Sequence, residues 1–167
     1  MLSDMNHHYQ LDGVAATERA GAVIARAASG GMVIALHGDL GAGKTTLVRG
    51  GLRGMGWMGP VKSPTYALVE HYPISSLYFY HFDFYRFTDP SEWETAGLAE
   101  YFRPDSVCLV EWPERIGDLL PEPDLDVVLS PAEYDGGRML ALRAHTPAGQ
   151  RCVAAVHAAG LQPVALP

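Results

Sequence analysis

The hydrophobic and polar positions along the chain follow two spacings, one typical of strands and the other of helices. Continuous or alternating apolar runs predict strands over residues 7–12, 32–36, 66–72, 77–85, 106–110, 125–129 and 139–144. Apolar residues three and four apart predict helices over residues 16–27, 44–53 and 147–159, with short pieces between 89 and 102. Asp12 or Thr17 is available to cap the first helix.

The stretch between the apolar run 32–36 and the second helix carries the strongest chemical motif. Gly38-Asp39-Leu40-Gly41-Ala42-Gly43-Lys44-Thr45-Thr46 matches G-x-x-x-x-G-K-[ST] at every fixed position and in the required strand–loop–helix context. Its glycines let the backbone wrap round an anion, and the loop N–H groups and the helix N-terminus supply positive charge. We expect Lys44 to reach the outer phosphates of a nucleoside triphosphate and the Thr45 hydroxyl to bind Mg²⁺.

The element order and this motif predict an α/β fold. We expect one phosphate-loop ATPase domain over residues 1–160, with three αβα layers around a mixed, mainly parallel sheet, and a flexible tail over 161–167. The turn sequences at 73–76 and 133–137 each predict an antiparallel hairpin, and the strand over 7–12 is expected at a sheet edge.

Three glycines interrupt the helix that follows the motif. Gly50, Gly51 and Gly54 each cost roughly 1 kcal/mol relative to alanine in a helix interior. Close packing of this helix against the sheet is one explanation for them.

Two acidic residues end predicted strands and are candidates for metal or water chemistry. Glu111 follows the apolar run 106–110, in the place of the magnesium-supporting carboxylate of phosphate-loop proteins, although Asp is the usual residue there. Asp83 lies among aromatic residues, where a carboxylate is costly without a partner. The spacing leaves two interpretations of Asp83 equal: a structural pair with Arg86, or a side chain that faces magnesium or water.

Composition and charge exclude several classes of protein. The 167 residues carry a net charge of −7, which opposes a general grip on nucleic acid phosphates. No apolar run approaches the roughly 20 residues of a membrane span, and the polar N-terminus is not a signal peptide. Cys108 and Cys152 form neither a disulfide framework nor a zinc spacing. We therefore expect a cytoplasmic protein that does not engage a membrane.

Several blocks together resemble the TsaE (YjeE) family of bacterial ATPases, which act in making threonylcarbamoyladenosine on tRNA. Besides the phosphate loop, the resemblance is carried by Val61-Lys62-Ser63-Pro64-Thr65-Tyr66, Leu68-Val69-Glu70, His81-Phe82-Asp83-Phe84-Tyr85-Arg86 and Leu109-Val110-Glu111-Trp112-Pro113. The blocks keep the family's order from about residue 31 to residue 113. Phe84 stands where leucine is usual, and the C-terminal third matches only loosely.

The resemblance implies an ATPase that uses ATP and Mg²⁺ and works with TsaD-like and TsaB-like proteins. ATP turnover would reset the TsaD–TsaB assembly between cycles, and tRNA would be met only through that complex. Asp83 would act in catalysis near the γ-phosphate, together with Lys44 and Thr65. Thr45 and Glu111 would serve Mg²⁺.

Two further segments receive a role from the resemblance. Residues 63–66 would form a nucleotide-sensing loop, and Gly137 and Arg138 would lie against the nucleotide.

Three other functions share parts of this pattern. A nucleotide-dependent assembly factor with incidental turnover would use the same loop. A small-molecule kinase usually carries an arginine-rich lid, and Arg103, Glu114 and Arg115 do not make one. A GTPase would carry the guanine-reading block Asn-Lys-x-Asp, which the sequence lacks.

Overall fold

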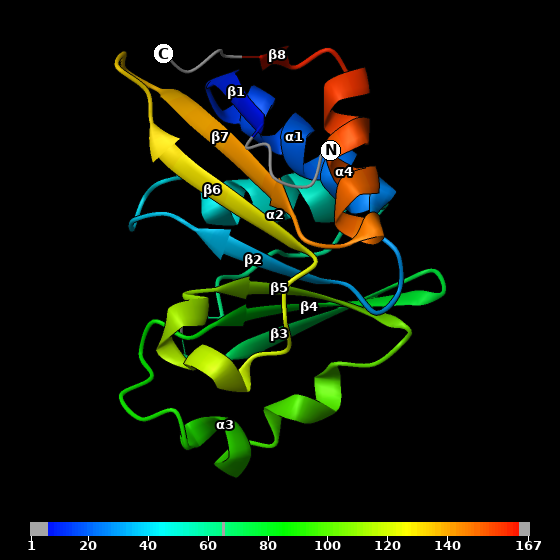
Figure 1. Cartoon of the computed structure of the whole chain (residues 1–167), viewed down its shortest axis with the longest axis vertical. Helices are drawn as coiled ribbons and strands as arrows, with labels where there is room; N and C mark the ends of the chain where they lie inside the picture. The colour runs from blue at the N-terminus through cyan, green and yellow to red at the C-terminus, as the bar shows by residue number, and fades with distance from the viewer. Residues whose placement is uncertain (1–6, 65, 164–167) are drawn as a thin grey trace.

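The computed structural model describes residues 7–64 and 66–163, and its strands form one eight-stranded sheet. The sheet order is β3-β4-β5-β2-β6-β7-β1-β8 (Figure 1). In chain order the strands are β1 (His7–Asp12), β2 (Val33–His37), β3 (Val69–Ile74), β4 (Leu77–Asp83), β5 (Ser106–Glu111), β6 (Leu125–Pro131), β7 (Gly137–Ala144) and β8 (Gln162–Pro163).

The sheet is parallel at its centre and antiparallel on both flanks. β4, β5, β2 and β6 run parallel to one another. β3 pairs antiparallel with β4, and β7, β1 and β8 continue antiparallel from β6. The predicted α/β class, the mixed sheet and both hairpins are confirmed. Beyond the two predicted hairpins, β1 adds antiparallel pairings with β7 and β8.

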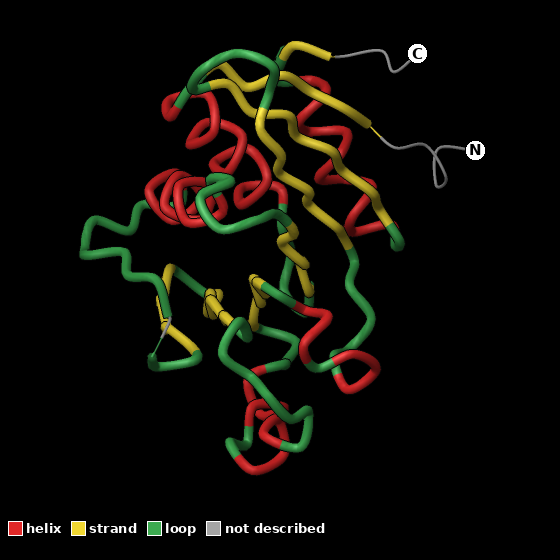
Figure 2. The backbone as a smooth tube through the Cα atoms, turned by 90° about the vertical axis from the view of Figure 1, so that its left-hand side faces the viewer, coloured by secondary structure: helices red, strands yellow, loops and turns green. Residues whose placement is uncertain are grey.

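Helices cover the sheet unequally, which gives three layers of different thickness. The long helices are α1 (Val14–Ala27), α2 (Lys44–Gly54) and α4 (Pro147–Ala158). They pack on one face, around a core to which β2 contributes Ile34 and Leu36. The other face carries a smaller, aromatic core under α3 (Glu92–Thr95) and the 3-10 turns η2 (Leu98–Tyr101), η3 (Pro113–Arg115) and η4 (Gly117–Leu119). Figure 2 shows the long helices at one end of the molecule and the short pieces at the other.

The start of α1 differs from the prediction. Its N-cap is Gly13, at φ 95°, and no side chain caps the helix. The Asp12 carboxylate instead accepts hydrogen bonds from Gln10 and Tyr134, and the Thr17 hydroxyl donates to the Gly13 carbonyl oxygen at 3.1 Å. A left-handed backbone at this position suits glycine, so the turn before α1 is set by Gly13 rather than by a polar cap.

Strand ends also differ from the predicted boundaries. β1 is not an edge strand, because β8 pairs with it on the side away from β7. β3 begins at Val69 instead of residue 66. Leu161 is buried and residues 162–163 form β8, so the folded part extends past the predicted boundary at 160. Residues 164–167 lie outside the described residues.

The glycines of α2 face another helix and not the sheet, which corrects the proposed reason for them. A Cβ atom at Gly50 would lie 2.2 Å from the Glu18 carbonyl oxygen of α1. A Cβ atom at Gly21 of α1 would lie 2.0 Å from the Leu47 carbonyl oxygen of α2. The two helices therefore approach backbone to backbone.

Two further features bear on the predicted class of protein. Cys108 and Cys152 are both free and buried, and burial raises the pKa of the Cys108 thiol to about 12. Of the helices in the described part of the chain, none combines the length and the apolar character that crossing a membrane requires.

Candidate active site

A cavity of about 360 Å³ opens at the carboxyl ends of the central parallel strands. This is the end of an open α/β sheet at which ligands bind. Its lining comes from the phosphate-loop motif and the start of α2, from the segment before β3, from the ends of β4 and β5 with the residues that follow them, and from β7: Leu40, Gly41, Gly43, Lys44, Thr45, Thr46, Ser63, Asp83, Tyr85, Arg86, Glu111, Trp112 and Arg138. Residues far apart in the sequence thus meet in one site.

The phosphate loop joins β2 to α2, and its glycines are required by its shape. Gly38 has φ 149°, and a Cβ atom there would lie 2.6 Å from the Leu129 carbonyl oxygen of β6. Gly43 has φ 109° and is the N-cap of α2, which begins at Lys44. The free N–H groups of this helix start therefore follow directly on the loop, as an anion site needs.

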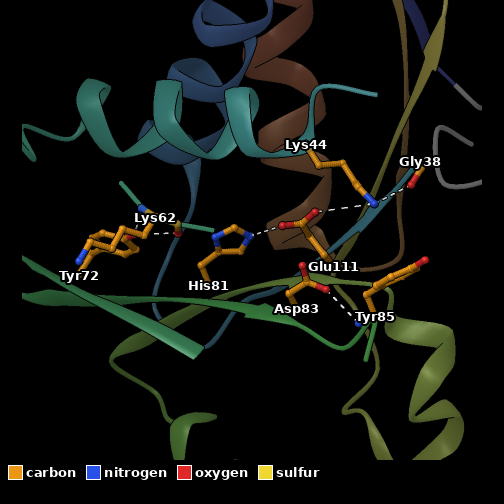
Figure 3. Close-up of polar contacts among 8 residues, drawn as sticks. All are labelled: Gly38, Lys44, Lys62, Tyr72, His81, Asp83, Tyr85 and Glu111. Atoms are coloured by element: carbon orange, nitrogen blue, oxygen red, sulfur yellow. Dashed lines mark hydrogen bonds and ion pairs between the residues drawn. The ribbon is translucent and has the colours of Figure 1, made fainter. Parts of the chain in front are cut away.

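The Lys44 ammonium group lies at the centre of the site and is buried (Figure 3). Its Nζ atom donates to the Gly38 carbonyl oxygen at 2.6 Å and lies 3.7 Å from Glu111 Oε1. The same atom is 4.2 Å from the centroid of the Trp112 ring. Trp112 has φ 57°, a strained conformation for a large side chain, so the backbone after β5 turns this ring over the lysine.

Asp83 and Glu111 end adjacent parallel strands in the same register, and both are buried. Asp83 Oδ1 accepts a hydrogen bond from the Tyr85 N–H at 2.9 Å. Burial raises the pKa of Asp83, and the nearby Glu111 carboxylate adds to the rise, while the Tyr85 N–H opposes it. Two carboxylates are therefore held close together at the mouth of the loop, where negative charge is disfavoured.

The proposed pair between Asp83 and Arg86 does not form in the structure. The Arg86 guanidinium lies 4.5 Å from the centroid of the Tyr66 ring, while the described hydrogen bond of Asp83 is to backbone. Of the two interpretations of Asp83, the one in which it faces the cavity agrees with the geometry.

His81 is a member of this site that sequence reasoning quoted but did not assign. It is fully buried on β4, two residues before Asp83 and on the same face of the strand. Its Nε2 atom lies 2.5 Å from Glu111 Oε2 (Figure 3). The period-two pattern of β4 places His81 and Asp83 on one face and could have revealed it.

Arg138 reaches the phosphate loop from β7. Its Nε atom donates to the Ala42 carbonyl oxygen at 2.9 Å and its Nη2 atom to the Gly41 carbonyl oxygen at 3.4 Å. The Gly137 carbonyl oxygen accepts from Arg138 Nη1 at 2.9 Å. Arg138 thus fixes the outer side of the loop and lines the cavity, whereas Gly137 is buried behind it.

Comparison with known proteins decides the family. The family model described as "Threonylcarbamoyl adenosine biosynthesis protein TsaE" matches residues 11–140.

The chain belongs to the TsaE family.

Individual relatives agree with this assignment. A Haemophilus influenzae protein named tRNA threonylcarbamoyladenosine biosynthesis protein TsaE is 49% identical over 124 residues, which are 74% of this chain and 77% of that protein. A Bacillus subtilis protein of the same name is 45% identical over 105 residues, or 63% of this chain and 65% of that one. The crystal structure of Bacillus subtilis YdiB superimposes with a TM-score of 0.78 at 30% identity, covering 93% of this chain and 96% of YdiB. The resemblance to TsaE is confirmed, and with it a family that takes part in threonylcarbamoyladenosine biosynthesis.

Most residues predicted for the TsaE site line its cavity, with a few exceptions. Asp39 is exposed and Ala42 is buried under the loop, so neither side chain lines the cavity. Gly38 contributes its carbonyl oxygen to Lys44. Ser63 of the predicted sensing segment does line the cavity, and Thr65 lies outside the described residues.

Proposed function

We propose that this chain is a Mg²⁺-dependent ATPase whose turnover resets a complex of TsaD-like and TsaB-like proteins. The observation that carries the proposal is the convergence of the phosphate loop, Lys44 and two strand-end carboxylates in one cavity. Family membership supports the place in threonylcarbamoyladenosine biosynthesis. A role inside the cytoplasm, with tRNA met only through the complex, belongs to the same proposal.

ATP would bind with its phosphates against the loop. The backbone N–H groups of residues 43–46, at the end of the loop and the start of α2, would donate to the phosphate oxygens. Lys44, which Gly38 holds at the loop, would neutralise the outer phosphates. Arg138 would keep the loop in shape through the carbonyl oxygens of Gly41 and Ala42.

The residues of the cavity suit Mg²⁺, a cation that prefers oxygen ligands and retains several waters. In the described part of the chain, His, Cys, Asp and Glu side chains do not gather in a group of three or more that could hold a metal alone. The Thr45 hydroxyl, Glu111 and phosphate or water oxygens would therefore share the ion. Burial, and after it the Glu111 charge, raises the pKa of Asp83, and a divalent cation would offset this cost of negative charge. Bound Mg²⁺ would supply charge neutralisation at the transferred phosphoryl group.

Hydrolysis needs a positioned water and positive charge at the transition state. Asp83 faces the cavity and would orient the attacking water. Arg86 lines the cavity but lies over the Tyr66 ring, so it does not yet serve as an arginine finger. Without an arginine finger at the transition state, the chain would hydrolyse ATP slowly alone and faster with its partners.

The test compares Lys44→Ala with a control, Lys62→Ala. Lys62 is the other lysine of the chain and is exposed. Calorimetry with ATP should show binding to the wild type and to Lys62→Ala, but not to Lys44→Ala, with thermal melts that confirm folding. Turnover should need Mg²⁺ and rise when TsaD-like and TsaB-like proteins are added.

Two results would count against the proposal. ATP affinity that survives in Lys44→Ala would remove the phosphate loop from its role. Turnover that partners leave unchanged would favour the alternative, an assembly factor in which ATP is bound and hydrolysis is incidental.

A further inference from the structure

The unexplained group in this site is the His81 imidazole. It lies on the face of β4 that carries Asp83, and none of its surface is exposed. One ring nitrogen, Nε2, is 2.5 Å from Glu111 Oε2. The other, Nδ1, has no hydrogen-bond partner among the described residues. A buried histidine that serves only the fold would be expected to satisfy both nitrogens.

The contact with Glu111 indicates which ring nitrogen of His81 donates a hydrogen bond. A carboxylate accepts, so the short contact to Glu111 needs an N–H at Nε2. The imidazole therefore donates to Glu111 through Nε2, while Nδ1 makes no hydrogen bond among the described residues.

The consequence for Glu111 is that its two oxygens have different surroundings. Oε2 is occupied by His81, while Oε1 faces the Lys44 ammonium at 3.7 Å on the cavity side. A glutamate at the end of a strand can otherwise adopt several rotamers. The His81 hydrogen bond selects the one in which Oε1 points at the loop (Figure 3).

We propose that His81 is a positioning residue, which holds Glu111 so that one carboxylate oxygen faces the cavity, where the cation bound with ATP would lie. The proposal rests on the proposed function, because Glu111 is the residue that would serve Mg²⁺. His81 itself touches neither the cation nor the nucleotide. Its effect should therefore appear in the dependence on Mg²⁺ and vanish when Glu111 is altered.

Two amide substitutions separate positioning from mere filling of space. In His81→Gln the side-chain amide can reach the place of Nε2 and donate to Glu111. In His81→Asn the amide is one methylene shorter and cannot reach it. We expect His81→Asn to raise the Mg²⁺ concentration for half-maximal ATP turnover by about tenfold or more, the usual effect of losing a group that orients a metal ligand. His81→Gln should stay near the wild type, and both should bind ATP in EDTA as the wild type does.

A double-mutant cycle identifies Glu111 as the route of the effect. His81→Asn made in a Glu111→Gln background should change the Mg²⁺ curve no further. His71→Leu, which removes an exposed histidine from β3, is the matched control and should leave the curve unchanged. If His81→Asn folds poorly by thermal melt, His81→Leu is measured in its place with the same expectation.

Three results would overturn this role. They are an unaltered Mg²⁺ curve in His81→Asn, equal shifts in His81→Asn and His81→Gln, and a full effect of His81→Asn that persists in the Glu111→Gln background. A wild-type protein that binds no ATP would instead defeat the proposed function, and the role of His81 with it. The two failures are distinct, since only the second affects the wild type.

Discussion

At the scale of single residues, Asp83 is where burial and chemistry conflict most. The residue is 9% exposed, and burial together with the Glu111 charge raises the pKa of its carboxyl group. A structural carboxylate would be expected to have a charged partner, yet the described hydrogen bond of Asp83 comes from a backbone N–H. Burial of a charged carboxylate in this way costs stability, so Asp83 is a candidate functional residue.

Asp83→Asn should therefore retain ATP affinity and lose hydrolysis. A loss of about 3 kcal/mol of transition-state stabilisation would lower the rate roughly a hundredfold. The melting temperature should not fall, because the amide avoids the cost of a buried charge. Calorimetry, partner-stimulated turnover and a thermal melt on one preparation test this. Asp89→Asn, at an exposed site before α3, is the control.

If the proposed function holds, the same variant should still join TsaD-like and TsaB-like proteins in ATP and then fail to leave them. Complex lifetime measured with the turnover would show this. Near-normal stimulated hydrolysis with a lowered melting temperature would return Asp83 to a structural role.

At the scale of elements, α1 packs backbone to backbone against α2, the helix that follows the phosphate loop. A Cβ atom at Gly50 would meet Glu18 backbone at 2.2 Å, whereas one at Gly51 would meet its nearest atom at 3.2 Å. Gly50→Ala should therefore force the helices apart and destabilise the protein by about 2 kcal/mol or more. Gly51→Ala should have a much smaller effect. The higher helix propensity of alanine should offset the free energy lost in the tighter contact with α1.

Thermal melts of the two variants test this interpretation. A loss of about 2 kcal/mol lowers the melting temperature of a chain of this size by roughly 4–8 °C. Equal melting temperatures would mean that the two helices are free to adjust.

On the sheet face opposite α1 and α2, one carboxylate of β6 joins β2 to the residue that follows β7. Asp126 of β6 accepts from His37 Nε2 at 2.9 Å and from His145 Nε2 at 2.6 Å. Burial acts to raise the pKa of Asp126, but these two hydrogen bonds outweigh it and leave the pKa below its ordinary value. A depressed pKa in the folded state stabilises the protein above the unfolded-state value, and this stability is lost as the pH falls through the folded-state value.

Asp126→Asn should thus lower the melting temperature at pH 7, by roughly 3 °C for each 1 kcal/mol lost. The difference from the wild type should narrow once the pH falls below about 4, where the unfolded carboxylate is protonated. Asp118→Asn, in the exposed turn η4, should show no such pH dependence. A difference that stays constant down to pH 3 would contradict the stabilising role of this charge.

At the scale of the whole molecule, the net charge of −7 opposes contact with tRNA. We expect the chain alone to bind free tRNA more weakly than roughly 10⁻⁶ M, the affinity of general nucleic-acid binders. Filter binding at low salt, where electrostatic attraction is strongest, is the measurement. Micromolar or tighter binding would reveal a basic surface that the overall charge conceals.

The sequence was most informative where backbone geometry demands particular residues. The glycines of the loop, Lys44 and Glu111 could be placed in one site from their spacing, whereas the place of Asp83 came from the resemblance to the family. Contacts between distant segments could not, because spacing along a chain carries no information about its partners in space. Two such contacts are the packing of the α2 glycines on α1 and the short hydrogen bond between His81 and Glu111.

One contact has a consequence for the order in which the protein is made. Arg138 holds the phosphate loop through Ala42, a residue 96 positions earlier in the chain. β1 likewise pairs with β7, which is synthesised near the end. At roughly 5–20 residues per second, a nascent chain carries an unsupported loop for about 5–20 seconds. The phosphate loop therefore gains its contact with β7 only after Arg138 of the 167 residues has emerged from the ribosome.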